Sequence, residues 1–402
     1  YRDDNYKVYS TNIRIDNKVN NWFSAGIAIQ GSYVYKNTPF AKLEDAMTAI
    51  PYGDLYDENG NYTTYPVEGD TNYINLLINN KSNYRGQGQN TKVYINPYIK
   101  ITPFKGFSWE SRINGTLTHS RSNSFTGQGS YNFIKSGGNV ETDTKASTSQ
   151  SNYYRYKWEN ILTYNFNIGK EHNFVVTGVS SYEHGRSEGA TASGIGILNN
   201  SYLWNNLDNA VTRQSSSSYS MSKRMGWMGR INYSYLGRYL ASVSVRHDGD
   251  SRLAKDEKWQ TFPAFSLGWR ISDEKFMEST KNWLDNLKLR VGYGETGSTS
   301  NISPYASTSK IEQSYLTIGG EKITTYGYSK EVANKKLTWE RSKSWNIGLD
   351  AAFLTSRIDL SMDWYLTNTS NVIWHKNLPV TGGAYNSTTQ YLTNVNLAET
   401  RN

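Results

Sequence analysis

Residues Gly292 to Gly297 have the types and spacing of a nucleotide-binding motif. They read Gly-Tyr-Gly-Glu-Thr-Gly and match G-x-G-x-x-G, a pattern whose glycines let the backbone approach a pyrophosphate. Such a site also needs a helix directly after the glycines, within a βαβ unit. A long segment rich in Ser and Asn follows instead. We therefore expect these glycines to lie on the polar face of a strand and to bind no cofactor.

The segment Asp248-Gly249-Asp250-Ser251 raises the question of calcium, because Asp oxygens at alternating positions are ligands for hard cations. The later ligands and the distal Glu of a calcium loop are absent. Asp-Gly is also a common hairpin turn. The sequence thus predicts a tight extracellular turn here and no metal site.

Residues for other catalytic chemistry are scattered. The chain has no Cys, no G-x-S-x-G elbow, no P-loop and no Ser/His/Asp set at a suitable spacing, so we expect no enzymatic activity. The five histidines form no i, i+4 metal pair. We expect them in loops or at strand ends, at His119, His172, His184, His247 and His375.

The composition favours strands over helices. Aromatic residues make up 14% of the 402 residues, with 32 Tyr and 12 Trp, while there are only 8 Pro. No run of about 20 apolar residues occurs, which excludes a helical membrane protein. The lack of such a run does not exclude a membrane β-barrel, because only every second residue of a barrel strand meets lipid. The net charge of +8 comes from evenly spread Lys and Arg, which indicates a solvated surface and no nucleic-acid partner.

Apolar and polar residues alternate along much of the chain, and this pattern predicts about twelve strands, which would position the motif residues discussed above. From Phe23 to Tyr35, Phe, Ile and Tyr on one face alternate with Ser, Gly and Gln on the other. The same period recurs at 265–271 and 287–293. Residues 345–353 and 358–364 form a predicted hairpin across Leu354 to Arg357.

The predicted links alternate strictly between short and long, as in outer-membrane barrels with short periplasmic turns and long extracellular loops. The short links are Asn17–Trp22, Thr102–Gly106, Gly169–Asn173, Leu236–Arg238 and Leu354–Arg357. The long links are Lys36–Asn90, Phe125–Ser151, Arg186–Ser222, Gly297–Lys335 and Ser370–Gln390.

Two links contain predicted helices. Ser272 to Asp285 reads as a short periplasmic helix, with Ser272 as its cap and Phe276, Trp283 and Leu284 as an apolar stripe. A further helical turn or two is expected from Ala41 to Ile50, ended by Pro51.

Between Gly229 and Phe276 the chain resembles SusC/RagA-type TonB-linked outer-membrane proteins. That segment reads GRINYSYLGRYLASVSVRHDGDSRLAKDEKWQTFPAFSLGWRISDEKF, and further matches lie at 287–297, 337–350, 357–373 and 394–402. The earlier third matches more loosely, mainly at 51–62, around an Asp-x-x-Gly turn. The chain departs from the family pattern at Asp250, where Ser is usual, at Leu253, where Phe is usual, and at Leu397, where Gly is common.

The resemblance implies an all-β fold: an antiparallel meander of about twelve strands, part of a large transmembrane barrel with 22 strands. Residues 1–402 would be a partial TonB-dependent receptor barrel domain, because nothing resembles the plug, the TonB box or the C-terminal strands. The implied function is import of oligosaccharides or peptides across the outer membrane of a Gram-negative, Bacteroidetes-like bacterium. The implied partners are outer-membrane lipid, a SusD-like lipoprotein lid and the TonB complex.

Aromatic residues in the predicted long loops are the candidate substrate contacts, because exposed rings can stack on sugars or on peptide side chains. They are Tyr202, Trp204 and Trp374. The alternative is that they pack within the loops or belong to an aromatic girdle at the membrane interface.

A second function class is a soluble or surface-attached β-rich module that recognises glycans through its loops. The soluble module and the membrane barrel differ in where the apolar faces of the strands lie. A module buries these faces in a core, whereas a barrel exposes them to lipid. For a partial barrel viewed alone, we predict a curved open sheet with two unpaired edges.

Overall fold

The computed structural model describes residues 5–38, 47, 49–308, 311–328, 331–377 and 390–395. Most of the helix predicted for Ala41 to Ile50 lies outside these residues. None of the helices in the described part of the chain has the length and apolar character needed to cross a membrane.

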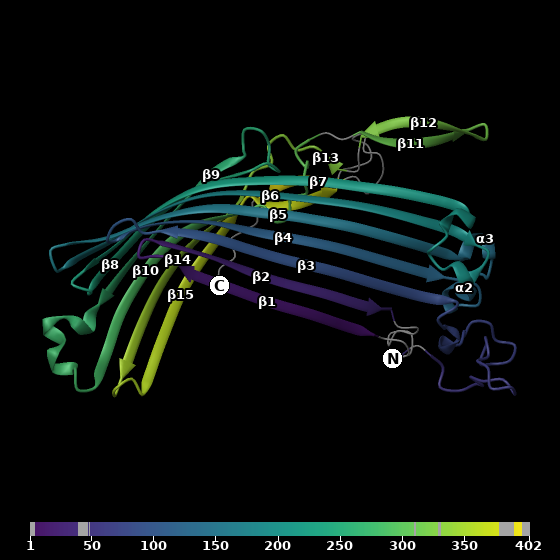
Figure 1. The fold of residues 1–402 in the computed structure, drawn as a ribbon, viewed down its shortest axis with the longest axis horizontal. Coiled ribbons are helices and arrows are strands. Elements are labelled where there is room, and N and C mark those ends of the chain that lie inside the picture. Colours follow the sequence, from purple (N-terminus) through teal and green to yellow (C-terminus); the bar gives the residue numbers. More distant parts are fainter. Residues whose placement is uncertain are drawn as a thin grey trace.

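Twelve strands form one antiparallel sheet in which each strand pairs with the next along the chain, except that β14 follows β10. The sheet is curved and open, with β1 and β15 at its two edges (Figure 1). This confirms the predicted meander. The strands are β1 (Tyr6–Lys18), β2 (Phe23–Asn37), β3 (Tyr84–Ile101), β4 (Phe107–Thr126), β5 (Lys145–Ile168), β6 (His172–Ile197), β7 (Ala210–Tyr235), β8 (Tyr239–Asp250), β9 (Trp259–Arg270), β10 (Leu284–Ser298), β14 (Glu340–Phe353) and β15 (Ile358–Ser370).

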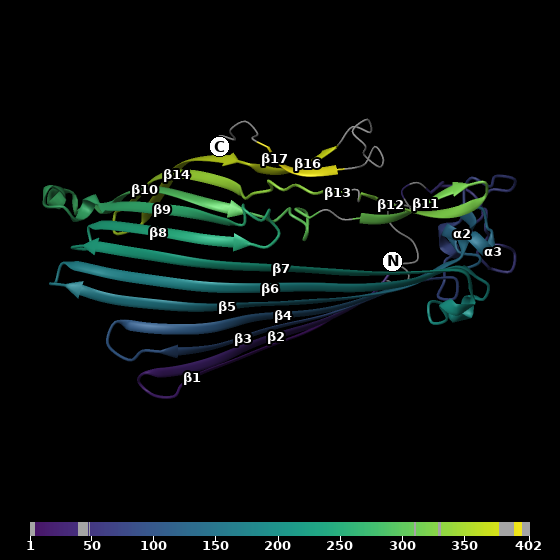
Figure 2. The same ribbon diagram turned by 90° about the horizontal axis from the view of Figure 1, so that it is seen from above.

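Short and long links lie at opposite ends of the sheet (Figures 1 and 2). All five predicted short links join neighbouring strands. The link from Leu236 to Arg238 reverses the chain within three residues, with positive φ angles at Leu236 and Gly237. The hairpin predicted across Leu354 to Arg357 is confirmed, with Phe353 paired to Ile358.

Two of the predicted long loops are shorter than expected, because the strands beside them continue. Strands β5, β6 and β7 contain 24, 26 and 26 residues, so the links shrink to 127–144 and 198–209. In the extension, Ser215 to Ser218 pair with Gly189 to Ala192. The sequence shows no apolar period there, because both faces of these strand ends are polar.

The long links hold their own small elements. A hairpin of β11 (Ile311–Ile318) and β12 (Glu321–Tyr328) follows β10, and a second small sheet has the order β13-β17-β16. Its strands are β13 (Glu331–Val332), β16 (Val372–Asn377) and β17 (Gln390–Val395). The helices are α2 (Tyr131–Lys135), α3 (Val140–Asp143), η1 (Leu76–Ile78), η2 (Asn200–Tyr202) and η3 (Leu207–Asn209).

The helix predicted from Ser272 to Asp285 is two short 3-10 helices, η4 (Ile271–Asp273) and η5 (Lys275–Thr280). Ser272 lies inside η4 and does not cap it. The apolar stripe is divided, since Leu284 already begins β10. Phe276 packs on Trp269 and Trp283 stacks on Phe353, so these side chains anchor the link to strand ends and do not build one helical face.

The two faces of the sheet differ in chemistry. On the apolar face, side chains such as Val243 and Leu267 are 55% and 56% exposed, and their cross-strand neighbours are also apolar. Side chains one position along, such as Ser242 and Ser266, lie on the opposite, polar face. No second layer covers the apolar rows in the described residues, so this sheet is not half of a soluble sandwich.

Two rows of packed rings cross the apolar face. The row near the short links contains Phe107, Tyr164, Phe166, Phe174, Tyr233, Tyr235 and Tyr239. The row toward the long links contains Tyr156, Tyr182, His184, Trp227, His247 and Trp259. The two rows are about 26 Å apart along β7, from Tyr235 to Trp227 at ~3.3 Å per residue, which is about 19 Å of depth at a strand tilt of ~45°. Two such girdles bounding an apolar band are typical of membrane barrels.

The buried apolar residues lie among the long links. One cluster joins the β8–β9 link, the segment after β10 and the small sheet; it contains Leu253, Phe262, Ile302, Ala306, Leu337, Trp339, Ile373 and Leu392. The other contains Phe125, Ala146, Ile197, Trp204 and Ala210. These clusters give the long links a fixed shape.

Candidate functional site

The polar face carries charged side chains in close opposite pairs. Each pair joins neighbouring strands or alternate residues of one strand, because side chains two positions apart share a face. The pairs are Arg14–Asp16, Glu110–Arg112, Lys157–Glu159, Arg155–Glu183, Arg246–Asp248 and Arg290–Asp350. These paired charges make the face strongly hydrophilic.

Arg290 holds three strands together on this face. It donates two hydrogen bonds to the Asp350 carboxylate, at 2.7 and 2.9 Å, and contacts Asp363 at 3.2 Å. The path from Arg290 to Asp363 crosses Gly348. A Cβ atom at Gly348 would lie 2.6 Å from Arg290 Cζ and from Asp363 Oδ1, so only glycine leaves room for this contact.

A polar cavity of ≈ 390 Å³ opens at the long-link end of the polar face. It is lined by charged side chains from β5 to β8 and by hydroxyls that follow β10. The polar lining groups belong to Arg155, Lys157, Ser181, Glu183, Arg224, Arg246, Asp248, Ser298, Thr299 and Ser300, with Trp339 at its wall. Such a surface can donate and accept many hydrogen bonds, as a sugar or a peptide backbone requires.

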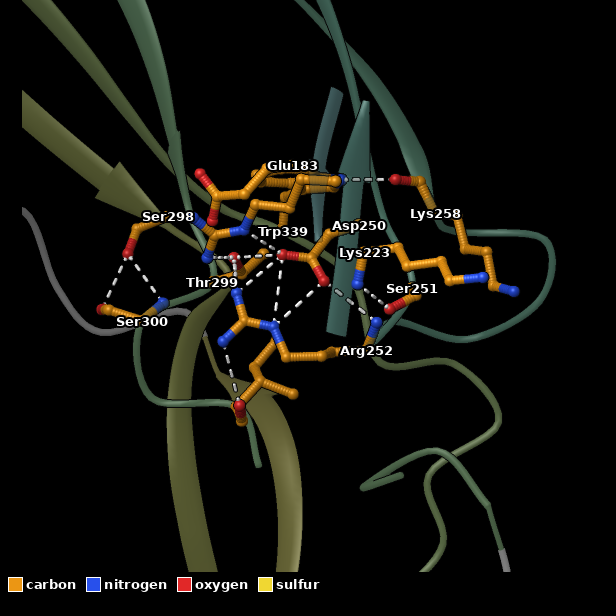
Figure 3. Close-up of polar contacts among 12 residues, drawn as sticks. Glu183, Lys223, Asp250, Ser251, Arg252, Lys258, Ser298, Thr299, Ser300 and Trp339 are labelled. Carbon is orange, nitrogen blue, oxygen red and sulfur yellow. Dashed lines mark hydrogen bonds and ion pairs between the residues drawn. The ribbon is translucent and has the colours of Figure 1, made fainter. Parts of the chain in front are cut away.

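Asp250 fixes the wall of this cavity (Figure 3). Its carboxylate accepts hydrogen bonds from Arg224 (2.8 Å), Arg252 (2.6 Å) and the Thr299 hydroxyl (2.8 Å). Arg252 also donates to the carbonyl of Ile302 at 3.2 Å. The network thereby joins β7, the β8–β9 link and the segment after β10.

Asp250 is 1% exposed and lies one residue beyond the level of Trp259, outside the apolar band. Burial raises the pKa of its carboxyl, but the hydrogen bonds and positive charge of Arg252, together with the Thr299 hydrogen bond, outweigh burial and hold that pKa below its usual value. Asp250 therefore stays charged and keeps both arginines in place.

The tight turn predicted at Asp248 to Ser251 is wrong. Residues Asp248 to Asp250 end β8, where Gly249 pairs with Trp259, and the link runs from 251 to 258. The Asp-Gly dipeptide predicted a turn, but here both residues are paired in the sheet, and Asp250 enters the buried network. Among the described residues, no group of three His, Asp or Glu side chains could hold a metal ion.

The candidate loop aromatics lie apart from one another. Trp204 is 8% exposed in the cluster with Phe125 and Ile197, under the Arg85 guanidinium at 5.7 Å. Tyr202 in η2 and Trp374 in β16 are exposed. Trp204 therefore packs within the loops, as the alternative interpretation predicted, whereas Tyr202 and Trp374 remain predicted substrate contacts.

The structure also places the other residues singled out by the sequence. Gly292 to Gly297 lie in β10, between the antiparallel strands β9 and β14, and no helix follows within the described residues up to 308. The expectation for the histidines is largely wrong, because His119, His184 and His247 lie well inside strands. Asp57 and Gly60 form the expected Asp-x-x-Gly turn, in which Gly60 N–H donates to Asp57 at 3.0 Å.

Sequence reasoning missed the charged cavity residues such as Arg155, Glu183 and Arg246. Their positions on the polar face follow from the period of each strand. Which of them meet depends on the register between strands, and that register becomes visible only in the structure.

A family model described as "TonB dependent receptor-like, beta-barrel" matches residues 3–402. The chain belongs to that family. The resemblance inferred from the sequence is thereby confirmed. The family consists of receptors and is not an enzyme class.

Curated relatives carry the same family name. The chain is 26% identical over 381 residues to TonB-dependent receptor P26 of Formosa agariphila, which covers 94% of this chain and 37% of that protein. It is 37% identical over 176 residues to TonB-dependent receptor SusC of Bacteroides thetaiotaomicron, which covers 42% of this chain and 17% of that protein. The receptor barrel described here thus spans little more than a third of the length of P26.

Solved structures share the fold. The RagAB peptide transporter matches 98% of this chain and 43% of its own, with a TM-score of 0.81 at 20% identity. The ferric citrate transporter FecA matches 97% of this chain with a TM-score of 0.52 at 11% identity. The twelve-stranded sheet therefore has the fold of a section of a receptor barrel.

Proposed function

We propose that this chain forms part of the barrel wall of an importer in the outer membrane of a Gram-negative, Bacteroidetes-like bacterium. The observation that supports this most strongly is the division of the sheet into an exposed apolar face and an ion-paired polar face. The first suits lipid contact, and the second suits a water-filled lumen. Similarity to TonB-dependent receptors of two such bacteria supports the location.

The imported molecule is an oligosaccharide or a peptide. The charged pairs offer donors and acceptors on one surface without a large net charge, so a hydrated, uncharged or zwitterionic molecule can exchange hydrogen bonds along the wall. The cavity beside Asp248 and Thr299 is the proposed contact region on this wall. Tyr202 and Trp374 are the proposed stacking residues at the extracellular end.

The importer works with two partners and without catalysis. A SusD-like lipoprotein closes the extracellular mouth, where the long links with their buried clusters offer a fixed docking surface. TonB supplies energy through a plug that belongs to another part of the protein. Similarity to SusC and the fold shared with RagAB support this arrangement. We do not propose the soluble module, because the apolar rows are exposed and the barrel family matches nearly the whole chain.

Deletion of the gene for the full-length receptor tests the proposal. We expect lost growth on one class of oligosaccharide or peptide, restored by the wild-type gene. Complementation with Arg155→Gln should restore uptake poorly, because Arg155 lines the cavity. Arg213→Gln, on the exposed β7 extension, is the matched control and should restore it fully. Unchanged uptake of all candidate oligosaccharides and peptides after deletion would contradict the import function.

A further inference from the structure

Two lysines lie together on the apolar side of the sheet, at the level of the aromatic row toward the long links, where Lys223 pairs with His184. Lys223 is part of β7 and Lys258 directly precedes β9. Both line a cavity of ≈ 170 Å³ together with Tyr182, Met225, Ser251 and Trp259. Their side chains extend to the same side, away from the Asp250 network (Figure 3).

These ammonium groups have no acidic partner among the described residues. Asp250 borders the same cavity, but its oxygens are occupied by Arg224, Arg252 and Thr299. Asp256 and Glu257 are exposed in the same link, and neither forms an ion pair with Lys223 or Lys258 within the described chain. Two unpaired positive charges beside one cavity create a local potential that attracts an anion.

The cavity lies at the depth of lipid headgroups. Lys223 is twelve positions before Tyr235, the end of β7 at the periplasmic turn, which is about 40 Å along the strand. With a strand tilt of ~45° this gives about 28 Å of depth, close to the ≈ 30 Å thickness of the hydrocarbon core. The exposed side chains of Met225 and Trp227 lie on the membrane side of Lys223.

We propose that Lys223 and Lys258 bind the phosphate of an outer-leaflet lipid headgroup. Each ammonium can donate up to three hydrogen bonds to phosphate oxygens. The Ser251 hydroxyl, whose oxygen accepts from the Lys223 backbone N–H at 2.9 Å, has its own proton to donate. The acyl chains then run along Met225 and Trp227 toward the apolar band. This continuity of charge with apolar surface selects a lipid over a free anion.

The test uses the full-length receptor in nanodiscs of phosphatidylcholine doped with phosphatidic acid, whose headgroup is a phosphate monoester. Native mass spectrometry measures which lipid stays bound. We expect the wild type to retain phosphatidic acid selectively, and Lys223→Gln/Lys258→Gln to bind it about 30-fold more weakly. The double arginine variant should retain it. Lys255→Gln/Lys281→Gln, an equal charge change at exposed sites outside the cavity, is the control and should match the wild type.

Three results would overturn the proposal. The first is equal retention of both lipids by the wild type. The second is an equal loss in the Lys255/Lys281 control, which would indicate a general charge effect. The third is inorganic phosphate binding to the receptor in undoped nanodiscs as tightly as phosphatidic acid binds, which would indicate a free-anion site. Nutrient uptake tests the import function separately, and we expect it to persist in Lys223→Gln/Lys258→Gln.

Discussion

Arg290 and Asp350 face each other across β10 and β14 through two parallel hydrogen bonds of 2.7 and 2.9 Å. This bidentate pair lies on the polar face of a sheet whose opposite face is apolar, and it also contacts Asp363 on β15. The contact exists because Gly348 lies beneath it with no side chain. Pairs of this kind let a barrel wall be hydrophilic without repelling a molecule of either charge.

Gly348→Ala should disrupt this pair. The new Cβ would lie 2.6 Å from Arg290 Cζ, so the guanidinium must leave Asp363. Both side chains are partly exposed, and we expect a loss of about 0.5–1 kcal/mol in unfolding free energy. Gly292→Ala is the control on the same face, because its Cβ would meet nothing closer than 3.8 Å. Urea unfolding of the full-length receptor in detergent measures both. An equal loss of unfolding free energy in the two variants would show that the contact between Arg290 and Asp363 over Gly348 is not the reason for a glycine at this position.

Asp250→Asn should loosen the long links beside the cavity. It leaves Arg252, whose side chain is 11% exposed, without a charged partner, and breaking a buried pair costs about 3 kcal/mol or more. Hydrogen exchange of residues 251–258 and 299–302 should therefore accelerate. Asp248→Asn, whose partner Arg246 is more exposed, should cost less than about 1 kcal/mol. Unchanged exchange in Asp250→Asn would show that the network does not hold these segments.

The periplasmic turn should respond to acid through Glu274. Hydrogen bonds from the Tyr239 hydroxyl (2.6 Å) and the Trp269 indole (3.0 Å) hold the pKa of this carboxyl below its ordinary value. Since the folded pKa is the lower one, the stabilisation is complete above the unfolded pKa of ~4.3 and disappears as the pH falls through the folded pKa. Hydrogen exchange of residues 271–283 should rise below about pH 4.

Two variants separate this effect from general acid unfolding. Glu274→Gln should remove most of the pH dependence of exchange in the turn, because the amide does not titrate. Glu278→Gln, at an exposed position of η5, should leave it unchanged. The same pH response in Glu274→Gln as in the wild type would assign the response to another group.

The loop aromatics should separate into a structural and a binding class. Trp204→Ala should destabilise the extracellular cluster by about 3–5 kcal/mol, because a buried ring is removed. Tyr202→Ala and Trp374→Ala should leave stability within about 0.5 kcal/mol but lower uptake of the imported molecule. Thermal unfolding and uptake measure the two effects. If neither exposed residue affects uptake, then substrate does not stack on them.

The sequence predicts the part of each strand that has one apolar and one polar face well, because such a strand has a period of two. It fails at the extensions of β6 and β7, where residues such as Ser215 to Ser218 meet water on both faces and no period remains. It also fails at Asp250, because the partners Arg224 and Thr299 are distant in sequence and only the register unites them. The sequence shows that Asp250 replaces the Ser usual in the family, but it does not show that this Asp binds Arg224, Arg252 and Thr299.

The alternation of lipid and water on neighbouring residues can be measured with single cysteines, since the 402 residues contain none. Val243→Cys and Ser244→Cys in the full-length receptor, each carrying a spin label in proteoliposomes, report collisions with oxygen in lipid or with a charged nickel chelate in water. We predict that the label at Val243 collides mainly with oxygen and the label at Ser244 mainly with the chelate. Equal access of the chelate to both positions would contradict a barrel wall between lipid and lumen.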